Sequence, residues 1–324
     1  MDYSLLRREV VSSRRLAELP AWDIFLSAYN KSERVNAVFD AVKAGRKEWL
    51  VHPEYDFSRE ELPGTGNLHV LQERDEAEFW RHYFMSAGVE SWPRDTRICI
   101  DSTGFMRPHL MLFLRRLRDL GFSRLYALYA DPKAYEAGEK TPFTKGAVTE
   151  VRQVRGFEGV HQPDRRDEDL LVIGAGYDDE LIRRVAENKR AARKLEMFGL
   201  PSLMPHMYEE NRLRAARAEE ALGQLPSRSL LFAPANDPFA TAQELHDRLQ
   251  EERKASRIGN VYLSPLATKA QTLGFALYYL CEWAGGPASI IFPFAEYYSR
   301  ETSVGLSRVW LYEFELDWFK PPLP

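Results

Sequence analysis

Short apolar runs alternate with amphipathic stretches along most of the chain. The first run, WDIFLSAYN, precedes a segment in which Val35, Val38 and Val42 share one helical face. Runs of the same kind follow: KEWLVHP, NLHVLQ, RICIDSTG, RLYALYADP, DLLVIGAG, KLEMFGLPS, SLLFAPAND, NVYLSPLATK and SIIFPFAEYY. Strands that alternate with helices of this length form right-handed βαβ units. The pattern therefore predicts an α/β fold with mainly parallel sheets.

The α/β pattern falls into two series, which we interpret as two Rossmann-like halves. We expect a first half over residues 21–135 and a second half over residues 170–324. An N-terminal helical segment is expected over 1–20, and a charged linker or cap over 136–169. The chain closes with SRVWLYEFELDWF, where aromatic and acidic residues alternate. This alternation predicts a half-buried, antiparallel edge strand.

The two halves match each other at a constant spacing. Residues 98–135 align without a gap with residues 260–297, an offset of 162, and the same offset places NLHVLQERD on SLLFAPAND. Any two βαβ units share apolar periodicity, so matched Leu, Phe and Val carry little weight. A serine, a cation five residues later and a terminal tyrosine also coincide. We interpret the match as an internal repeat or a fused pseudo-dimer, with equivalent loops facing one ligand cleft.

In the second half, the polar loop SPLATK follows a predicted strand and opens a predicted helix. Ser264, Thr268 and Lys269 could hold an anion such as a phosphate there, together with the N–H groups of the first helical turn. An ordinary helix N-cap with a solvated lysine has the same sequence pattern. The sequence leaves these two readings open.

The corresponding loop of the first half, DSTGFMR, provides Ser102, Thr103 and Arg107 as the equivalent ligand residues. A guanidinium can bind a phosphate through two parallel hydrogen bonds. Tyr297 could stack on a base, although a core tyrosine in a terminal strand fits the pattern as well.

Two carboxyls are candidates for acid/base catalysis. Asp101 opens the first polar loop, and Asp237 follows a predicted strand of the second half. A carboxyl buried in a cleft can be tuned to act as an acid or base near neutral pH.

The composition and the absence of common motifs exclude several classes of function. The chain has 324 residues, 44% hydrophobic and 28% charged, with a formal net charge of -4, which is typical of a globular protein and not of a duplex nucleic-acid binder. It has two cysteines, no metal-ligand spacing among its seven histidines and no P-loop motif. No apolar run is long enough for a membrane span, and the N-terminus lacks a signal sequence. We expect a cytoplasmic protein without membrane attachment, resident metal or cofactor.

The segment NVYLSPLATKAQTLGFALYYL resembles the strand-loop-helix of CRISPR-associated Rossmann-fold (CARF) sensors and of the related SAVED domains, which consist of two fused CARF-like halves. In these families a polar residue and a lysine of the loop contact a cyclic oligonucleotide. The resemblance implies a nucleotide-binding or nucleotide-sensing accessory protein of a prokaryotic antiviral defence system. It assigns ligand contacts to Ser264, Thr268 and Lys269, and the internal repeat extends them to the first half.

Three hypotheses about function follow. The first is the nucleotide sensor, which acts through a protein partner or as a homo-oligomer. The second is an enzyme that acts on a nucleotide or its N-glycosidic bond, with Asp101 or Asp237 as acid/base. The third is a scaffold subunit of a multiprotein complex, whose aromatic C-terminal edge strand pairs with a partner.

Overall fold

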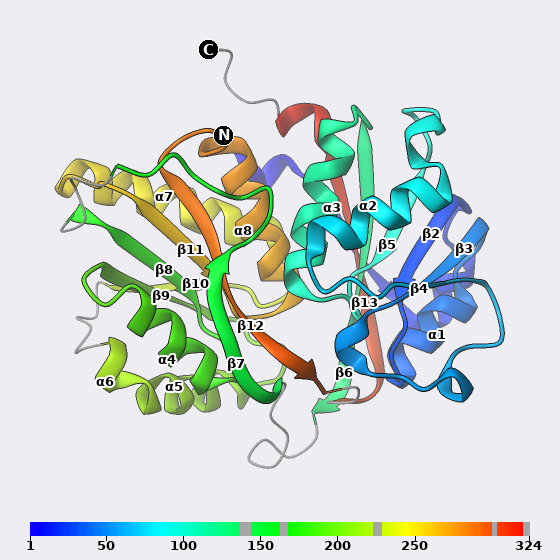
Figure 1. Cartoon of the computed structure of the whole chain (residues 1–324), viewed down its shortest axis with the longest axis horizontal. Coiled ribbons are helices and arrows are strands. Elements are labelled where there is room, and N and C mark those ends of the chain that lie inside the picture. The colour runs from blue at the N-terminus through cyan, green and yellow to red at the C-terminus, as the bar shows by residue number, and fades with distance from the viewer. Residues whose placement is uncertain (136–143, 163–167, 223–228, 300–302, 320–324) are drawn as a thin grey trace. The chain divides into compact units, whose positions relative to one another are not determined.

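The computed structural model of the chain divides into two compact units, which we describe separately (Figure 1). The residues that it describes are 1–135, 144–162, 168–222, 229–299 and 303–319. The first unit consists of Leu6–Lys145 and Glu296–Trp318. The second unit consists of Met1–Leu5, Gly146–Ala295 and Phe319–Pro324.

The first unit contains a seven-stranded sheet in the order β1-β13-β6-β5-β2-β3-β4. Strands β2 to β6 are parallel, β13 is antiparallel to β6, and β1 is antiparallel to β13. The strands are β1 (Arg8–Ser12), β2 (Trp22–Ala28), β3 (Ala44–Val51), β4 (Asn67–Val70), β5 (Ile98–Asp101), β6 (Arg124–Tyr135) and β13 (Ser303–Glu315).

Helices follow the parallel strands of this unit, as their apolar periodicity predicts. They are α1 (Glu33–Ala41), α2 (Glu76–Ala87) and α3 (Arg107–Asp119). In α1 the buried positions Val35, Val38 and Phe39 belong to one apolar cluster with Phe25 of β2. Gly88 ends α2 because it takes the left-handed conformation, with φ of 69°, at the C-cap.

The second unit contains a six-stranded sheet in the order β10-β9-β8-β11-β12-β7. Its strands are β7 (Thr144–Gln153), β8 (Leu170–Gly174), β9 (Arg193–Gly199), β10 (Leu230–Ala233), β11 (Val261–Pro265) and β12 (Ala288–Tyr298). Strands β8 to β12 are parallel. Two hydrogen bonds, Val154 N to Ile290 O and Thr149 Oγ1 to Phe294 O, show that β7 and β12 run in opposite directions.

The helices of the second unit are α4 (Asp179–Asn188), α5 (Met207–Arg217), α6 (Glu219–Leu222), α7 (Pro238–Ala255) and α8 (Lys269–Glu282). Short 3₁₀ turns in the two units span Tyr3–Leu5, Ser13–Glu18, Pro53–Tyr55, Arg59–Glu61, Val89–Ser91 and Leu316–Phe319. None of the helices in the described part of the chain combines the length and the apolar character that spanning a bilayer requires.

The structure confirms the α/β class and the two mainly parallel sheets, and it corrects three expectations. The C-terminal strand β13 is antiparallel, but it is not an edge strand, because β1 pairs along its outer side. The segment 1–20 contains β1 between two short 3₁₀ helices and no α-helix. Part of the expected linker, Thr144–Gln153, is a sheet strand, whereas 136–143 and 163–167 lie outside the described residues.

The two antiparallel strands do not join the sheets that sequence order would give them. Strand β7 follows β6 in the chain but pairs with β12. Strand β13 follows β12 in the chain but pairs with β6. Each unit therefore completes its sheet with a strand that follows the last parallel strand of the other unit.

Candidate functional site

The candidate site of the first unit lies at the carboxyl ends of β2 and β5. From β2 the chain builds β3 and β4 on one side and then returns to β5 and β6 on the other side. Ligands of open α/β sheets bind outside the carboxyl ends at such a switch point. The loop after β5 presses on the end of β2 so closely that a Cβ on Gly104 would lie 2.1 Å from the Ala28 carbonyl oxygen. Glycine is therefore required there.

Asp101 is the last residue of β5 and is fully buried at this point. Its carboxylate accepts hydrogen bonds from the Ser27 hydroxyl at 3.0 Å and from the Thr103 backbone N–H at 3.0 Å. Burial raises the pKa of the Asp101 carboxyl, and these hydrogen bonds and the charge of Arg34 oppose the increase. Asp101 is thus a buried carboxyl of raised pKa that also fixes the loop.

The hydroxyls of Ser102 and Thr103 bind the protein backbone. Ser102 Oγ donates to the Leu128 carbonyl at 2.8 Å, and Thr103 Oγ1 accepts from the Ala130 N–H at 3.1 Å. Both residues are buried and tie the loop after β5 to β6. Ser102 thus uses its hydroxyl proton on the backbone, and Thr103 accepts one backbone hydrogen bond.

The positive charges of two arginines, Arg34 and Arg107, lower the pKa of the same buried tyrosine, Tyr55. The Tyr55 hydroxyl donates to the Gly104 carbonyl at 2.8 Å. Burial raises the pKa of Tyr55 to about 12, and the positive charges of Arg107 and Arg34 oppose this increase. Arg34 is 9% exposed and donates through Nη1 to the Ala130 carbonyl. Its Nε has no hydrogen-bond partner among the described residues. These two guanidiniums supply the positive charge at the switch point.

Glu54 adds a second buried carboxyl, next to Tyr55 in the turn after β3. It is 6% exposed, and its Oε2 has no hydrogen-bond partner among the described residues. Burial raises the pKa of Glu54 to about 7, and the charge of Arg74 opposes the increase. A carboxyl with this pKa exchanges its proton at neutral pH, which is the property that a general acid/base needs.

Arg74 interacts with both Tyr297 and Glu54. The Arg74 guanidinium is 5.2 Å from the centre of the Tyr297 ring and donates to the Glu296 carbonyl. The same guanidinium lowers the pKa of Glu54. The structure thus links Tyr297 electrostatically to the carboxyl end of the first sheet.

In the second unit, the predicted residues lie at the carboxyl end of β11 and the start of α8. Ser264 is fully buried, and its hydroxyl has no hydrogen-bond partner among the described residues. Thr268 caps α8: its hydroxyl accepts from the Gln271 N–H at 3.2 Å and donates to the Ala235 carbonyl. Lys269 is half-buried as the first residue of the helix. The three residues are neighbours along one short segment, and the hydroxyl of Thr268 is used as a cap.

The other catalytic candidate, Asp237, is the N-cap of α7. Its Oδ1 accepts from the backbone N–H groups of Phe239 and Ala240, both at 3.0 Å. Asp75 caps α2 in the same way, accepting from the N–H groups two and three residues later. The geometry of Asp237 therefore matches a helix cap more closely than an acid/base.

The arrangement in the first unit can bind an anion and exchange a proton. The guanidiniums of Arg34 and Arg107 provide charge-assisted donors, which bind phosphate and carboxylate strongly. Asp101 and Glu54 provide buried carboxyls that hold protons more tightly than exposed ones. Among the described residues, no cluster of three or more His, Cys, Asp or Glu side chains is placed to hold a metal ion.

Arg34, Glu54 and Tyr55 were not identified from the sequence. Arg34 is in the first turn of α1, and the other two are in the turn that follows β3. None of them belongs to a recognisable motif. The signal was positional: each follows a parallel strand next to the switch point, which becomes visible once the strand order is known.

No protein-family model matches the chain, and no significant match was found among curated proteins or solved structures.

Proposed function

We propose that this protein binds a nucleotide-type ligand, of the cyclic oligonucleotide class, at the carboxyl ends of its parallel sheets. In this proposal it senses the ligand for a prokaryotic antiviral defence system and acts through a protein partner or a homo-oligomer. The observation that carries the proposal is the pair of guanidiniums at the switch point of the first sheet, the buried Arg34 and the half-buried Arg107.

The helix positions support an internal repeat at the offset of 162. Helices α2 and α7 begin at Glu76 and Pro238, and helices α3 and α8 begin at Arg107 and Lys269. Both pairs of first residues are 162 apart. The cations of Arg107 and Lys269 therefore occupy equivalent places, each at the start of the helix that follows the fourth parallel strand.

The strand order supports the same interpretation. Numbered along each half, the parallel strands of both sheets have the order 3-2-1-4-5, and an antiparallel strand pairs with the fifth, β13 in the first sheet and β7 in the second. In the first sheet β1 adds one further strand outside β13. The antiparallel strands β7 and β13 are exchanged between the sheets. Exchange of an identical element is the mark of a swapped dimer, so we infer that the chain is a fused, strand-exchanged pseudo-dimer of Rossmann-like halves.

The ligand class follows from the chemistry of the two carboxyl ends. Nucleotide phosphates need charged donors, which Arg34, Arg107 and Lys269 provide. A base needs an aromatic face, and Tyr297 is held near the first site by Arg74. A carboxyl such as Glu54, protonated below neutral pH, can donate a hydrogen bond to a base edge.

Thermal unfolding against a panel of mononucleotides, dinucleotides, cyclic oligonucleotides and NAD tests this proposal. A ligand at about 100 times its Kd stabilises the folded state by about 2.7 kcal/mol, which raises Tm by about 5 °C in a chain of this size. The variants are Arg107→Gln and Lys269→Ala. The matched control is Lys254→Ala, which removes an exposed lysine at the end of α7.

A Tm shift that Lys254→Ala keeps and Arg107→Gln loses supports binding at the first site. A shift lost only in Lys269→Ala assigns the ligand to the second unit alone. A flat panel, or a shift that both variants keep, contradicts the proposal.

A buried carboxyl that titrates near neutral pH, together with a second one of raised pKa, favours an enzyme that cleaves a nucleotide or its N-glycosidic bond as the second candidate function. Glu54 has a pKa of about 7, and the pKa of Asp101 is raised as well. Chromatography of the panel after incubation distinguishes the two functions. A released base or phosphate, absent with Asp101→Asn or Glu54→Gln, would assign an enzyme, whereas an unchanged ligand assigns a sensor.

A further inference from the structure

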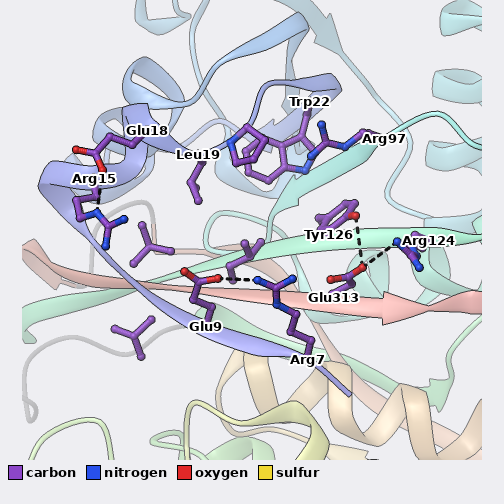
Figure 2. A pocket seen from close by; sticks show the side chains of 14 residues that line it. Arg7, Glu9, Arg15, Glu18, Leu19, Trp22, Arg97, Arg124, Tyr126 and Glu313 are labelled. Atoms are coloured by element: carbon purple, nitrogen blue, oxygen red, sulfur yellow. Dashed lines mark hydrogen bonds and ion pairs between the residues drawn. The ribbon is translucent and has the colours of Figure 1, made fainter. Parts of the chain in front are cut away.

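A pocket of about 360 Å³ opens in the first unit at the end of the sheet where the parallel strands begin (Figure 2). Trp22 is the first residue of β2, Arg97 precedes β5, and Arg124 is the first residue of β6. The carboxyl-end site lies where these strands finish, so the pocket is at the opposite edge of the same sheet. None of the residues of the proposed nucleotide site lines it.

The pocket is rich in charge, and most of its charge is paired. Its lining contains four arginines and three glutamates. Three ion pairs within the lining join Arg7 to Glu9 at 3.3 Å, Arg15 to Glu18 at 2.8 Å and Arg124 to Glu313 at 3.3 Å. Figure 2 shows these pairs as dashed lines and shows none at Arg97.

Arg97 is the arginine of the lining whose guanidinium forms no ion pair within the described residues, and the Asp23 carboxylate accepts from its backbone N–H at 2.8 Å. Its side chain donates one hydrogen bond, from Nη1 to the Ala21 carbonyl at 2.9 Å. The guanidinium lies 5.9 Å from the centre of the Trp22 ring and 5.8 Å from that of Tyr126. The two rings contact each other edge to face. Aromatic contacts on a guanidinium hold its plane while leaving its other N–H donors available.

The rest of the lining is apolar and belongs to different segments. Leu19 precedes β2, Val11 is in β1, and Leu311 is in β13. Small-molecule sites occupy about 300–1,000 Å³ and combine apolar walls with a few polar groups. The volume of this pocket, at the lower end of that range, is suited to one ring and one charged group.

We propose that this pocket binds a small anion with an aromatic body, carrying a carboxylate or a phosphate. The anionic group binds the guanidinium of Arg97 through two N–H donors. The ring of the ligand packs against Leu19, Val11 and Leu311. The pocket is independent of the nucleotide site at the other edge of the sheet.

Isothermal titration calorimetry with benzoate, phenyl phosphate and inorganic phosphate tests the proposal on the full chain. We expect benzoate or phenyl phosphate to bind, and inorganic phosphate to bind at least about tenfold more weakly because it lacks the apolar body. Arg97→Gln should lose about tenfold or more in affinity, and Arg97→Lys should recover part of it, since a lysine keeps the charge without the fork. The control is Arg14→Gln, which removes an exposed arginine outside the lining and should bind like the wild type.

Preference between benzoate and phenyl phosphate identifies the anionic group. Binding that Arg97→Gln leaves unchanged overturns the proposal, as does inorganic phosphate binding as tightly as phenyl phosphate. Absence of binding to the wild type up to about 10 mM also overturns it. NMR of the Arg97 Nε–H in the wild-type protein gives a readout that does not depend on the variants folding: its resonance should shift when phenyl phosphate is added.

Discussion

Two buried carboxyls, Glu54 and Asp101, differ in how many hydrogen bonds they accept. Glu54 is enclosed with one carboxylate oxygen lacking a hydrogen-bond partner among the described residues. Asp101 is enclosed as well but accepts two hydrogen bonds. Burial penalises the ionised form in both, and hydrogen bonds from Ser27 and Thr103 offset that penalty for Asp101. A backbone hydrogen bond and the charge of Arg74 offset part of it for Glu54. The two carboxyls therefore differ in how strongly pH should change their contribution to stability.

The first prediction at this scale is that Glu54 makes the protein less stable as pH rises. Its folded-state pKa of about 7 is higher than the usual value of about 4.3 for an unfolded chain. Between these values the folded state binds the extra proton, so stability falls with increasing pH. We expect this carboxyl to lower the free energy of unfolding by about 2 kcal/mol between pH 5.5 and pH 8. Urea unfolding at the two pH values measures it.

Glu54→Gln should remove this part of the pH dependence, because the amide does not titrate. Glu90→Gln, at an exposed position, should leave it in place. The same pH slope in wild type and Glu54→Gln would show that Glu54 is ionised at little cost in the folded protein.

Hydroxyl groups in the predicted loops show why residue type alone does not identify a ligand. Ser102, Thr103 and Thr268 all lie next to a strand end or a helix start, as the sequence predicts. Each uses its hydroxyl in a hydrogen bond to the backbone. A serine or threonine at such a position satisfies backbone groups as readily as it binds a ligand. The guanidinium of Arg34, which belongs to no recognisable motif, is a better candidate to bind an anion than these hydroxyls.

At the scale of the element, matched helix caps are the clearest common feature of the two units. Asp75 is the N-cap of α2 and Asp237 is the N-cap of α7, and each carboxylate accepts from two of the four backbone N–H groups that a helix start leaves without partners. Both helices begin at positions that the sequence alignment pairs.

We predict that Asp75→Ala and Asp237→Ala each destabilise the protein by about 1 kcal/mol, because a helix loses its cap. Asp237→Asn should stay within a few tenths of a kcal/mol of the wild type, since asparagine caps equally well. Chemical denaturation measures both. A ligand-cleaving activity that Asp237→Asn abolishes at unchanged stability would instead restore Asp237 as a catalytic residue.

The strands predicted from apolar runs are present, but their neighbours were not predictable from the runs. The alternation in Ser303–Glu315 correctly indicates an antiparallel strand with one face buried. It does not show that β1 covers the outer side, because β1 is five residues long and mostly exposed. The scaffold hypothesis relied on β13 as a free edge, and this pairing removes its basis.

At the scale of the whole molecule, the exchange of β7 and β13 decides which part of the chain completes which sheet. Val309, Tyr312 and Phe314 of β13 are fully buried in the first unit, although they follow the second half in sequence. A change at the C-terminus should therefore affect the N-terminal part of the chain.

We predict that ending the chain after residue 302 destabilises the first unit more than the second. Removal of β13 leaves β6 without one neighbour and β1 without its pairing partner. Hydrogen exchange should show lost amide protection in β6 and β1, while the amides of β8 and β11 keep theirs. Loss of protection confined to β8 and β11 would contradict the exchanged arrangement.

The sequence alone determined the class of this protein and the position of most strands and helices. It did so because apolar periodicity and cap residues are local properties, read within ten to fifteen residues. It also suggested the repeat spacing of 162, which is part of the proposal and to which the starts of two helix pairs conform. Only the tertiary structure decided the strand exchange, the covering of β13 by β1, and the gathering of Arg34, Glu54 and Tyr55. These features depend on which distant segments pair, and neither periodicity nor residue type carries that information.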